Sequence, residues 1–156
     1  MSAFPLSLRA VDLAINEIKV RSIEEAERRG KVATRGTLNT LSVSAVSTSF
    51  GATGTLEGEE QWKYVGNGRG PGGKPPIQNL LAWVNAGHQD MNAWAIQATI
   101  AKYGSKDYRN NAPNVFLSAI DDFENGAGMD RMENSVGGEM EAVVADMITT
   151  NLKARR

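Results

Sequence analysis

The sequence contains no cysteine and a single histidine, His88, and these two shortages exclude several kinds of site. Without cysteine there can be no disulfide, no thiolate zinc site and no cysteine nucleophile. A site with several histidine ligands is also excluded, and a catalytic triad would have to use His88. Because no serine or threonine lies in a recognisable nucleophile turn, we interpret His88 as a surface histidine and expect no enzymatic activity, metal or cofactor.

The chain also lacks an excess of charge of either sign, and it lacks a long apolar run. The chain has 17 Lys and Arg against 18 Asp and Glu, so no global basic field attracts nucleic acid or an anionic membrane. The longest apolar-rich run, 140–148, contains Glu141 and Asp146 and is far shorter than the roughly 20 residues that span a bilayer. The N-terminus lacks a basic start and reaches Arg9 and Asp12 too early for a secretory signal. We therefore expect a protein made in the cytoplasm, with no membrane contact.

Glycine is plentiful and aromatic residues are few, which favours a folded body with a long functional loop. The first half of the chain predicts a long amphipathic helix from Pro5 to Arg29, closed by Gly30. Alternating Thr, Ser and Val residues then indicate strands with a bulge or break between them. The segment "TLEGEEQWKYV" places Leu56, Trp62 and Tyr64 on one face, as in a β-hairpin with one buried side.

After the glycine loop the pattern predicts only helices. One begins at Pro76 and stops near Gly87, the next is capped by Asp90, and another is opened by Pro113. The last, at about 126–156, carries a methionine-rich stripe that is read either as core or as a subunit interface. This order predicts an α+β fold in a single domain, 1–156.

The segment "VGNGRGPGGKPP" raises the question of nucleotide binding. From Gly68 to Lys74 it follows the phosphate-loop pattern, but Pro75 stands where a Ser or Thr would hold magnesium, and its three prolines remove N–H donors. The three glycines that fit a dinucleotide fingerprint lack the βαβ context. We interpret 66–76 as an extended loop that reaches a neighbouring subunit or a large partner. A disordered surface loop, and a small nucleotide- or nucleic-acid-binding module using Gly68–Lys74, stay open as alternatives.

Several motifs in order resemble a family of tailed-bacteriophage virion proteins, the tail-completion or neck (head-tail connector) proteins. The shared features are a strand ending in an aromatic and a Tyr-Val or similar pair, a Gly-Arg-Gly-Lys-Pro-Pro loop, an "Ile-x-x-Leu-x-x-Trp" helix, an alanine-rich helix ending in glycine, and a looser "Phe-Leu-x-x-Ala" match on another helix. In this chain they fall at 62–65, 68–76, 77–83, 93–104 and 116–119. The resemblance extends from the first helix to about residue 124.

The resemblance implies a structural α+β subunit in the virion, assembled in the host cytoplasm and without catalysis. It would form a homo-oligomeric ring, of six or twelve copies, that contacts portal or other connector proteins and tail proteins and lets DNA pass without sequence-specific binding. Candidate contacts with a subunit or partner are Trp62, Tyr64, Arg69, Lys74, Pro75 and Pro76.

Overall fold

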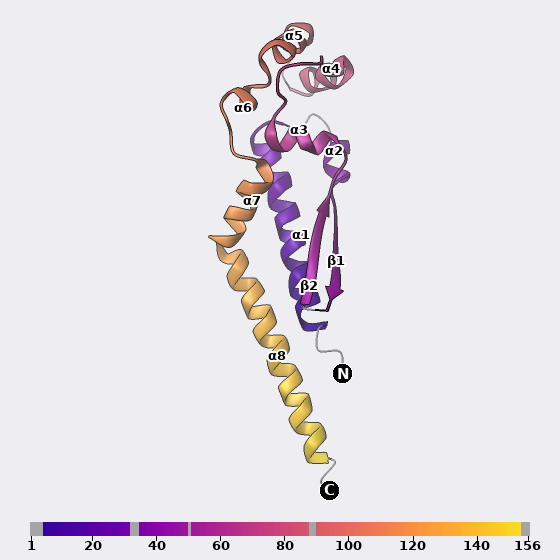
Figure 1. Ribbon diagram of the computed structural model, residues 1–156, viewed down its shortest axis with the longest axis vertical. Coiled ribbons are helices and arrows are strands. Elements are labelled where there is room, and N and C mark those ends of the chain that lie inside the picture. Colours follow the sequence, from indigo (N-terminus) through magenta and orange to yellow (C-terminus); the bar gives the residue numbers. More distant parts are fainter. Residues whose placement is uncertain (1–4, 32–34, 50, 88–89, 154–156) are drawn as a thin grey trace. The chain divides into compact units, whose positions relative to one another are not determined.

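The computed structural model describes residues 5–31, 35–49, 51–87 and 90–153, and within them it has the expected α+β composition (Figure 1). His88 lies outside the described residues. The elements follow one another along the chain as α1 (Pro5–Arg28), α2 (Arg35–Asn39), β1 (Ser42–Thr48), β2 (Gly51–Glu57), α3 (Gln61–Asn67), α4 (Ile77–Asn85), α5 (Ala93–Tyr103), α6 (Lys106–Arg109), α7 (Val115–Glu124) and α8 (Ala127–Lys153).

The predicted hairpin around Trp62 is wrong, because the hairpin lies earlier and consists of β1 and β2. The segment 61–67 is the helix α3 instead. The N–H of Trp62 donates to the carbonyl of Glu59 at 2.9 Å, and the buried residues of α3 are Trp62, Val65 and Gly66, at helical spacing. Trp62 and Tyr64, expected on one face, are 3% and 39% exposed respectively. The alternation of apolar and polar residues over this short segment therefore led to a wrong prediction of a strand.

Two helix starts also differ from the prediction. Asn92, not Asp90, caps α5, since its side chain accepts hydrogen bonds from the N–H groups of Trp94 and Ala95. Asn114 performs the same function before α7 in place of Pro113, and its Oδ1 accepts from the N–H of Phe116 at 2.7 Å. The C-terminal helix α8 is 27 residues long and runs through its two central glycines without a break.

The residues that contact one another in space form two compact units. Unit 1 consists of Met1–Ile18, Val43–Leu56 and Asp121–Arg156, and unit 2 of Lys19–Ser42 and Glu57–Ile120. Each unit therefore gathers segments that are far apart in the sequence.

In unit 1, β2 and α8 both pack on α1. A Cβ on Gly54 would lie 3.1 Å from Val11 and 3.2 Å from Ile15, so the missing side chain lets β2 approach the helix closely. On another side, Arg131 pairs with Glu17, and Arg9 lies 3.9 Å from Glu139. These two pairs fix α8 as antiparallel to α1.

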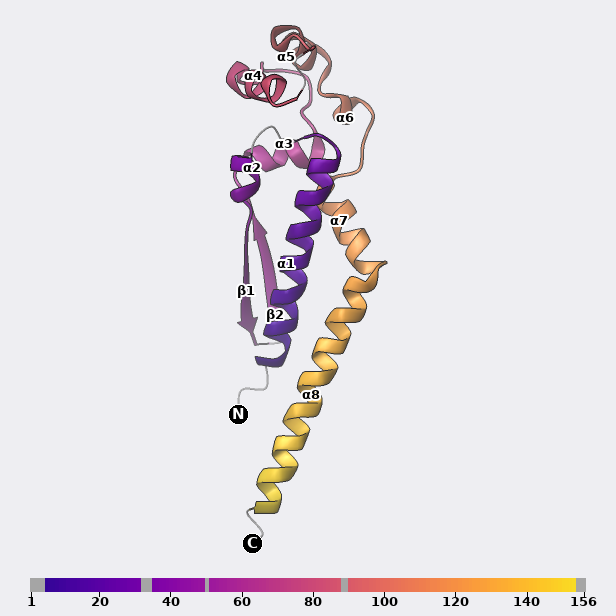
Figure 2. The ribbon, with the colours of Figure 1, turned by 180° about the vertical axis from the view of Figure 1, so that it is seen from behind.

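The same register leaves the end of α8 without α1 beside it. Arg131 meets Glu17 and Glu139 meets Arg9, so residue 143 falls roughly opposite Pro5, the first described residue. The ten residues from Val144 to Lys153 extend past it by about 15 Å at the rise of an α-helix. Both views show α8 continuing beyond the start of α1 (Figures 1 and 2).

In unit 2, the hydrophobic core is built around Trp62. Its indole ring lies 5.6 Å from that of Phe116, and its Nε1–H donates to the carbonyl of Thr37 and to Oγ1 of Thr40, each at 3.1 Å. A second tryptophan, Trp83 of α4, donates to the carbonyl of Gly30 at 3.0 Å. The other buried apolar residues of the unit are Ala26, Leu38, Leu41, Val65, Val84, Ala93, Val115 and Ala119.

Candidate functional site

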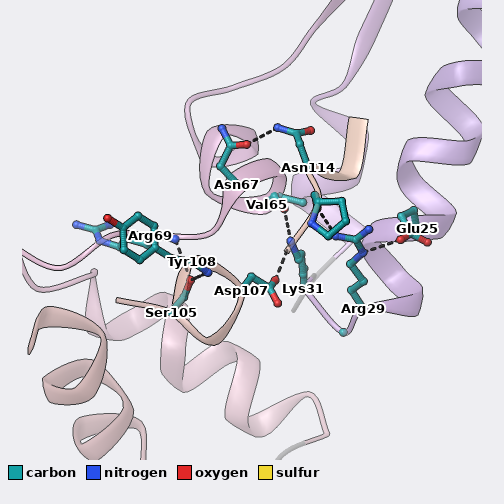
Figure 3. Close-up of polar contacts among 12 residues, drawn as sticks. Glu25, Arg29, Lys31, Val65, Asn67, Arg69, Ser105, Asp107, Tyr108 and Asn114 are labelled. Carbon is teal, nitrogen blue, oxygen red and sulfur yellow. Dashed lines mark hydrogen bonds and ion pairs between the residues drawn. The ribbon is translucent and has the colours of Figure 1, made fainter. Parts of the chain in front are cut away.

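The glycine loop is held against the junction between α5 and α6 by its own backbone. The N–H of Arg69 donates to Oγ of Ser105 at 2.9 Å, and the N–H of Ser105 donates back to the carbonyl of Arg69 at 2.7 Å. Further along, the N–H of Gly72 donates to the carbonyl of Ala101 at 2.9 Å. Figure 3 shows Arg69 beside Ser105 and Tyr108. The loop is therefore an ordered part of unit 2.

Gln97 holds the far end of the loop. Its Nε2 donates to the carbonyl of Pro75 at 2.7 Å, and both residues are buried. Gln97 stands among the apolar residues of α5 and was not predicted to be a functional residue. A buried side-chain amide requires a partner, and here that partner is the loop backbone.

Close packing explains three of the glycines. Gly68 and Gly104 have φ of +75° and +81°, a conformation that L side chains rarely adopt. A Cβ on Gly68 would lie 2.6 Å from Oγ of Ser105, and one on Gly104 would lie 2.9 Å from the carbonyl oxygen of Arg69. A Cβ on Gly70 would lie 3.2 Å from the ring of Tyr108. These glycines let two backbone segments meet.

The tip of the loop is different. Residues 71–74 are exposed, a Cβ on Gly72 would meet nothing within 4 Å, and one on Gly73 would meet only the guanidinium of Arg69, at 3.9 Å. A phosphate loop works by aiming consecutive N–H groups at its ligand. Here the N–H groups of Arg69 and Gly72 are bonded inside the chain, and the prolines have none.

The predicted contact residues fall into two groups. Tyr64 and Arg69 come together at the surface, where the guanidinium carbon lies 4.7 Å from the ring centroid, a cation–π arrangement. Lys74 is exposed at the tip, and Pro76 is exposed where α4 begins. Trp62 and Pro75 are instead buried and support the fold.

The lysine Lys31, whose side chain is largely buried, was not predicted to have a structural role. Nζ of Lys31 lies 2.8 Å from the carbonyl oxygen of Val65 and 2.8 Å from a carboxylate oxygen of Asp107, and the lysine side chain is 9% exposed (Figure 3). The interaction joins the end of α1 to α3 and α6. The sequence "GSKD" at 104–107, a helix stop followed by a capping serine, is the signal that could have indicated a structured turn around Asp107.

A second polar cluster joins α1 to the start of α7. Arg29 donates to Glu25 at 2.6 Å, to the carbonyl of Pro113 and to Oγ of Ser118. Hydrogen bonds from Arg28, and then from Arg29, hold the pKa of Glu25 below its ordinary value. The carboxylate is thus kept charged where it fixes two arginines.

The methionine-rich face of α8, by contrast, is largely exposed. We call the residues Met129, Met132, Val136, Met140 and Val143 the α8 stripe; Met132 and Val136 are half-buried and the other three are exposed, Met140 at 56%. Val144, at its border, is exposed too. The side chains of Met147 and Ile148 lie outside the described part. The prediction that this face of α8 belongs to the hydrophobic core is therefore wrong for Met129, Met140 and Val143, which are exposed.

Within the described ranges, no three His, Cys, Asp or Glu residues are grouped so that they could hold a metal ion. None of the helices described is long and apolar enough to cross a membrane. No protein-family model, curated protein or solved structure matches the chain.

Proposed function

We propose that this chain is a structural virion protein that forms a homo-oligomeric ring at the head-tail junction of a tailed bacteriophage. It would join the portal and the tail during assembly, as a neck, connector or tail-completion protein, and would catalyse no reaction. The family resemblance of the glycine loop and its flanking helices supplies the class. The exposed α8 stripe is the structural observation that supports it best.

The stripe supports an assembling subunit because exposed apolar surface is costly for a protein that works alone. Large contiguous apolar patches on soluble chains mark interaction sites, and methionine suits surfaces that must adapt to a partner. A helix of this length also draws most of its stability from packing along its apolar face. The register of α8 on α1 places Val144 beyond the first described residue of α1, and this exposed valine offers apolar surface that a neighbouring molecule would cover.

Sedimentation velocity and negative-stain microscopy of the purified protein test the proposal. We expect a ring-sized particle, either for the protein alone or after addition of the portal or tail protein of the same virus. The comparison requires the same protein concentration with and without each partner. A chain that remains monomeric with both partners present would refute the proposal.

Titration with ATP and with DNA separates this proposal from the nucleotide- or nucleic-acid-binding alternative. Phosphate-driven binding should weaken steeply between low and moderate salt, and it should disappear in Lys74→Ala if the loop tip provides the contact. We expect neither ligand to bind, because loop N–H groups are used inside the chain. Salt-sensitive binding that Lys74→Ala abolishes would replace the ring proposal with the alternative.

A further inference from the structure

The α8 stripe is bordered by a row of acidic side chains. Successive residues of an α-helix are rotated by about 100°, so Asp130, Glu133 and Glu141 follow one another along a row next to the stripe. All three are exposed. Gly137 occupies the same row, and a Cβ there would meet nothing within 4 Å. The surface therefore offers an apolar strip, an acidic border and room for a close approach.

Charge is divided unequally between the two units. By sequence, unit 1 has 5 Lys and Arg against 10 Asp and Glu, whereas unit 2 has 12 against 8. The near-neutral total of the chain conceals this difference. In residues 61–120 the excess is larger, with 6 basic residues against 2 acidic ones, and one of these two, Asp107, is already paired with Lys31.

Unit 2 also has a surface on which cations and aromatic rings alternate. Besides Arg69 over Tyr64, Nζ of Lys102 lies 4.8 Å from the ring centroid of Tyr103. Lys106 and Tyr108 follow on α6 and are exposed. The hydrogen bonds between Arg69 and Ser105 hold the loop at the α5–α6 junction, within three residues of Lys102, Tyr103, Lys106 and Tyr108 along the chain. We call them the basic-aromatic surface: Tyr64, Arg69, Lys102, Tyr103, Lys106 and Tyr108.

We propose that the α8 stripe and its acidic row in one copy dock on the basic-aromatic surface of a second copy. The two surfaces are complementary in apolar character and in charge. Aromatic rings and methionines provide the apolar contact, and the charges that flank them are opposite in sign. In an antiparallel pair of α8 stripes the acidic rows of the two copies would face each other, and like charges oppose that arrangement. The contact is therefore between different surfaces, as in head-to-tail association.

The inference rests on the proposed function, because head-to-tail contacts close into rings when the rotation between subunits allows it. A protein partner fits the basic-aromatic surface better than DNA does. DNA binding depends on cations directed at phosphates. Here Arg69 lies over Tyr64 and donates to the carbonyl of Gly73, and Lys102 lies over Tyr103.

Charge reversal in two sets tests the contact in the full chain. The acidic-row variant is Glu133→Lys with Glu141→Lys, and the basic-surface variant is Lys102→Glu with Lys106→Glu. Asp121→Lys with Glu124→Lys is the matched control, because it changes the net charge of unit 1 equally at exposed positions outside the row. Circular dichroism verifies folding, and sedimentation velocity measures association of each variant alone and of the two variants mixed, with portal protein added where wild type needs it.

We expect each reversed variant alone to associate at least about tenfold more weakly than wild type, because like charges then face each other. The control should assemble normally. Mixing the two reversed variants should restore association, since each then offers the charge that the other lacks. Wild-type assembly that both reversals leave unchanged, or a mixture that does not recover, overturns the docking inference while the ring proposal stands. DNA binding that Lys102→Glu with Lys106→Glu removes, without any effect on assembly, would assign the surface to nucleic acid.

Discussion

Replacing Gly104 by alanine should loosen the glycine loop, and its cost follows from the geometry. Gly104 has φ of 81° and ψ of 171°, a region that is nearly exclusive to glycine, so an alanine there is strained by about 1–3 kcal/mol. Its Cβ would also lie 2.8 Å from Cδ1 of Tyr108 and 2.9 Å from the carbonyl oxygen of Arg69. Relief of the second contact requires backbone movement.

That movement would weaken the hydrogen bond from Ser105 N–H to Arg69, which is 2.7 Å long. A lost hydrogen bond of this kind adds about 0.5–1.5 kcal/mol. Together, the two effects lower the free energy of unfolding of unit 2 by about 1.5–4.5 kcal/mol. Gly73→Ala is the matched control, because its Cβ would meet only Arg69 at 3.9 Å, and we expect a change within about 0.5 kcal/mol.

Urea denaturation followed by tryptophan fluorescence measures the difference. Hydrogen exchange at the amides of Arg69 and Ser105 shows whether the loss is local, and we expect faster exchange in Gly104→Ala alone. If both alanine variants unfold at the same urea concentration, with unchanged exchange, then the loop is not held against the α5–α6 junction as described.

Three other changes probe unit 2. Trp62→Ala should destabilise it by about 3–5 kcal/mol in urea melts, since it empties the core; equal stability of this variant and wild type would contradict that placement. Asp107→Ala, which leaves Lys31 buried with one partner, should cost about 1–3 kcal/mol, more than Lys31→Met; the reverse order would show that the ion pair is unimportant. The depressed pKa of Glu25 means that its contribution is full above about pH 4.5 and is lost as the pH falls through the folded-state pKa. Glu25→Gln should therefore lose less stability than Glu27→Gln between about pH 7 and about pH 3 in urea melts, and equal losses would disprove the assignment.

Long periodic segments could be predicted from the sequence, and short ones could not. The patterns of α1, α4 and α8 extend over two or more turns, so a spacing of three to four residues identifies them. In α3, by contrast, the seven residues fit both the helical spacing of three to four residues and the strand spacing of two. Trp62 and Tyr64 were therefore predicted on one face of a strand. The segment forms a helix that begins with the hydrogen bond from Trp62 N–H to the carbonyl of Glu59. The helix is stabilised by the packing of Trp62 against Thr37 and Phe116.

The candidate site was only partly predictable for a related reason. Composition identified the glycine loop, and its prolines argued against a phosphate site. The partners of the loop, however, lie 22 to 36 residues further along the chain, at Gln97, Ala101 and Ser105. No local pattern reveals such pairs. A glutamine among apolar residues, such as Gln97, is a usable signal, because burial requires a hydrogen-bond partner.

The hydrogen bonds at the two ends of the glycine loop make its tip a convenient place to insert foreign sequence. Arg69 is anchored to Ser105 and Pro75 to Gln97, so the span between them is fixed from outside the tip. Lengthening a closed loop costs little, about 0.6 kcal/mol for each doubling of its length. A short epitope or fluorophore-binding peptide between Gly72 and Gly73 would therefore leave the anchors in place and label the protein.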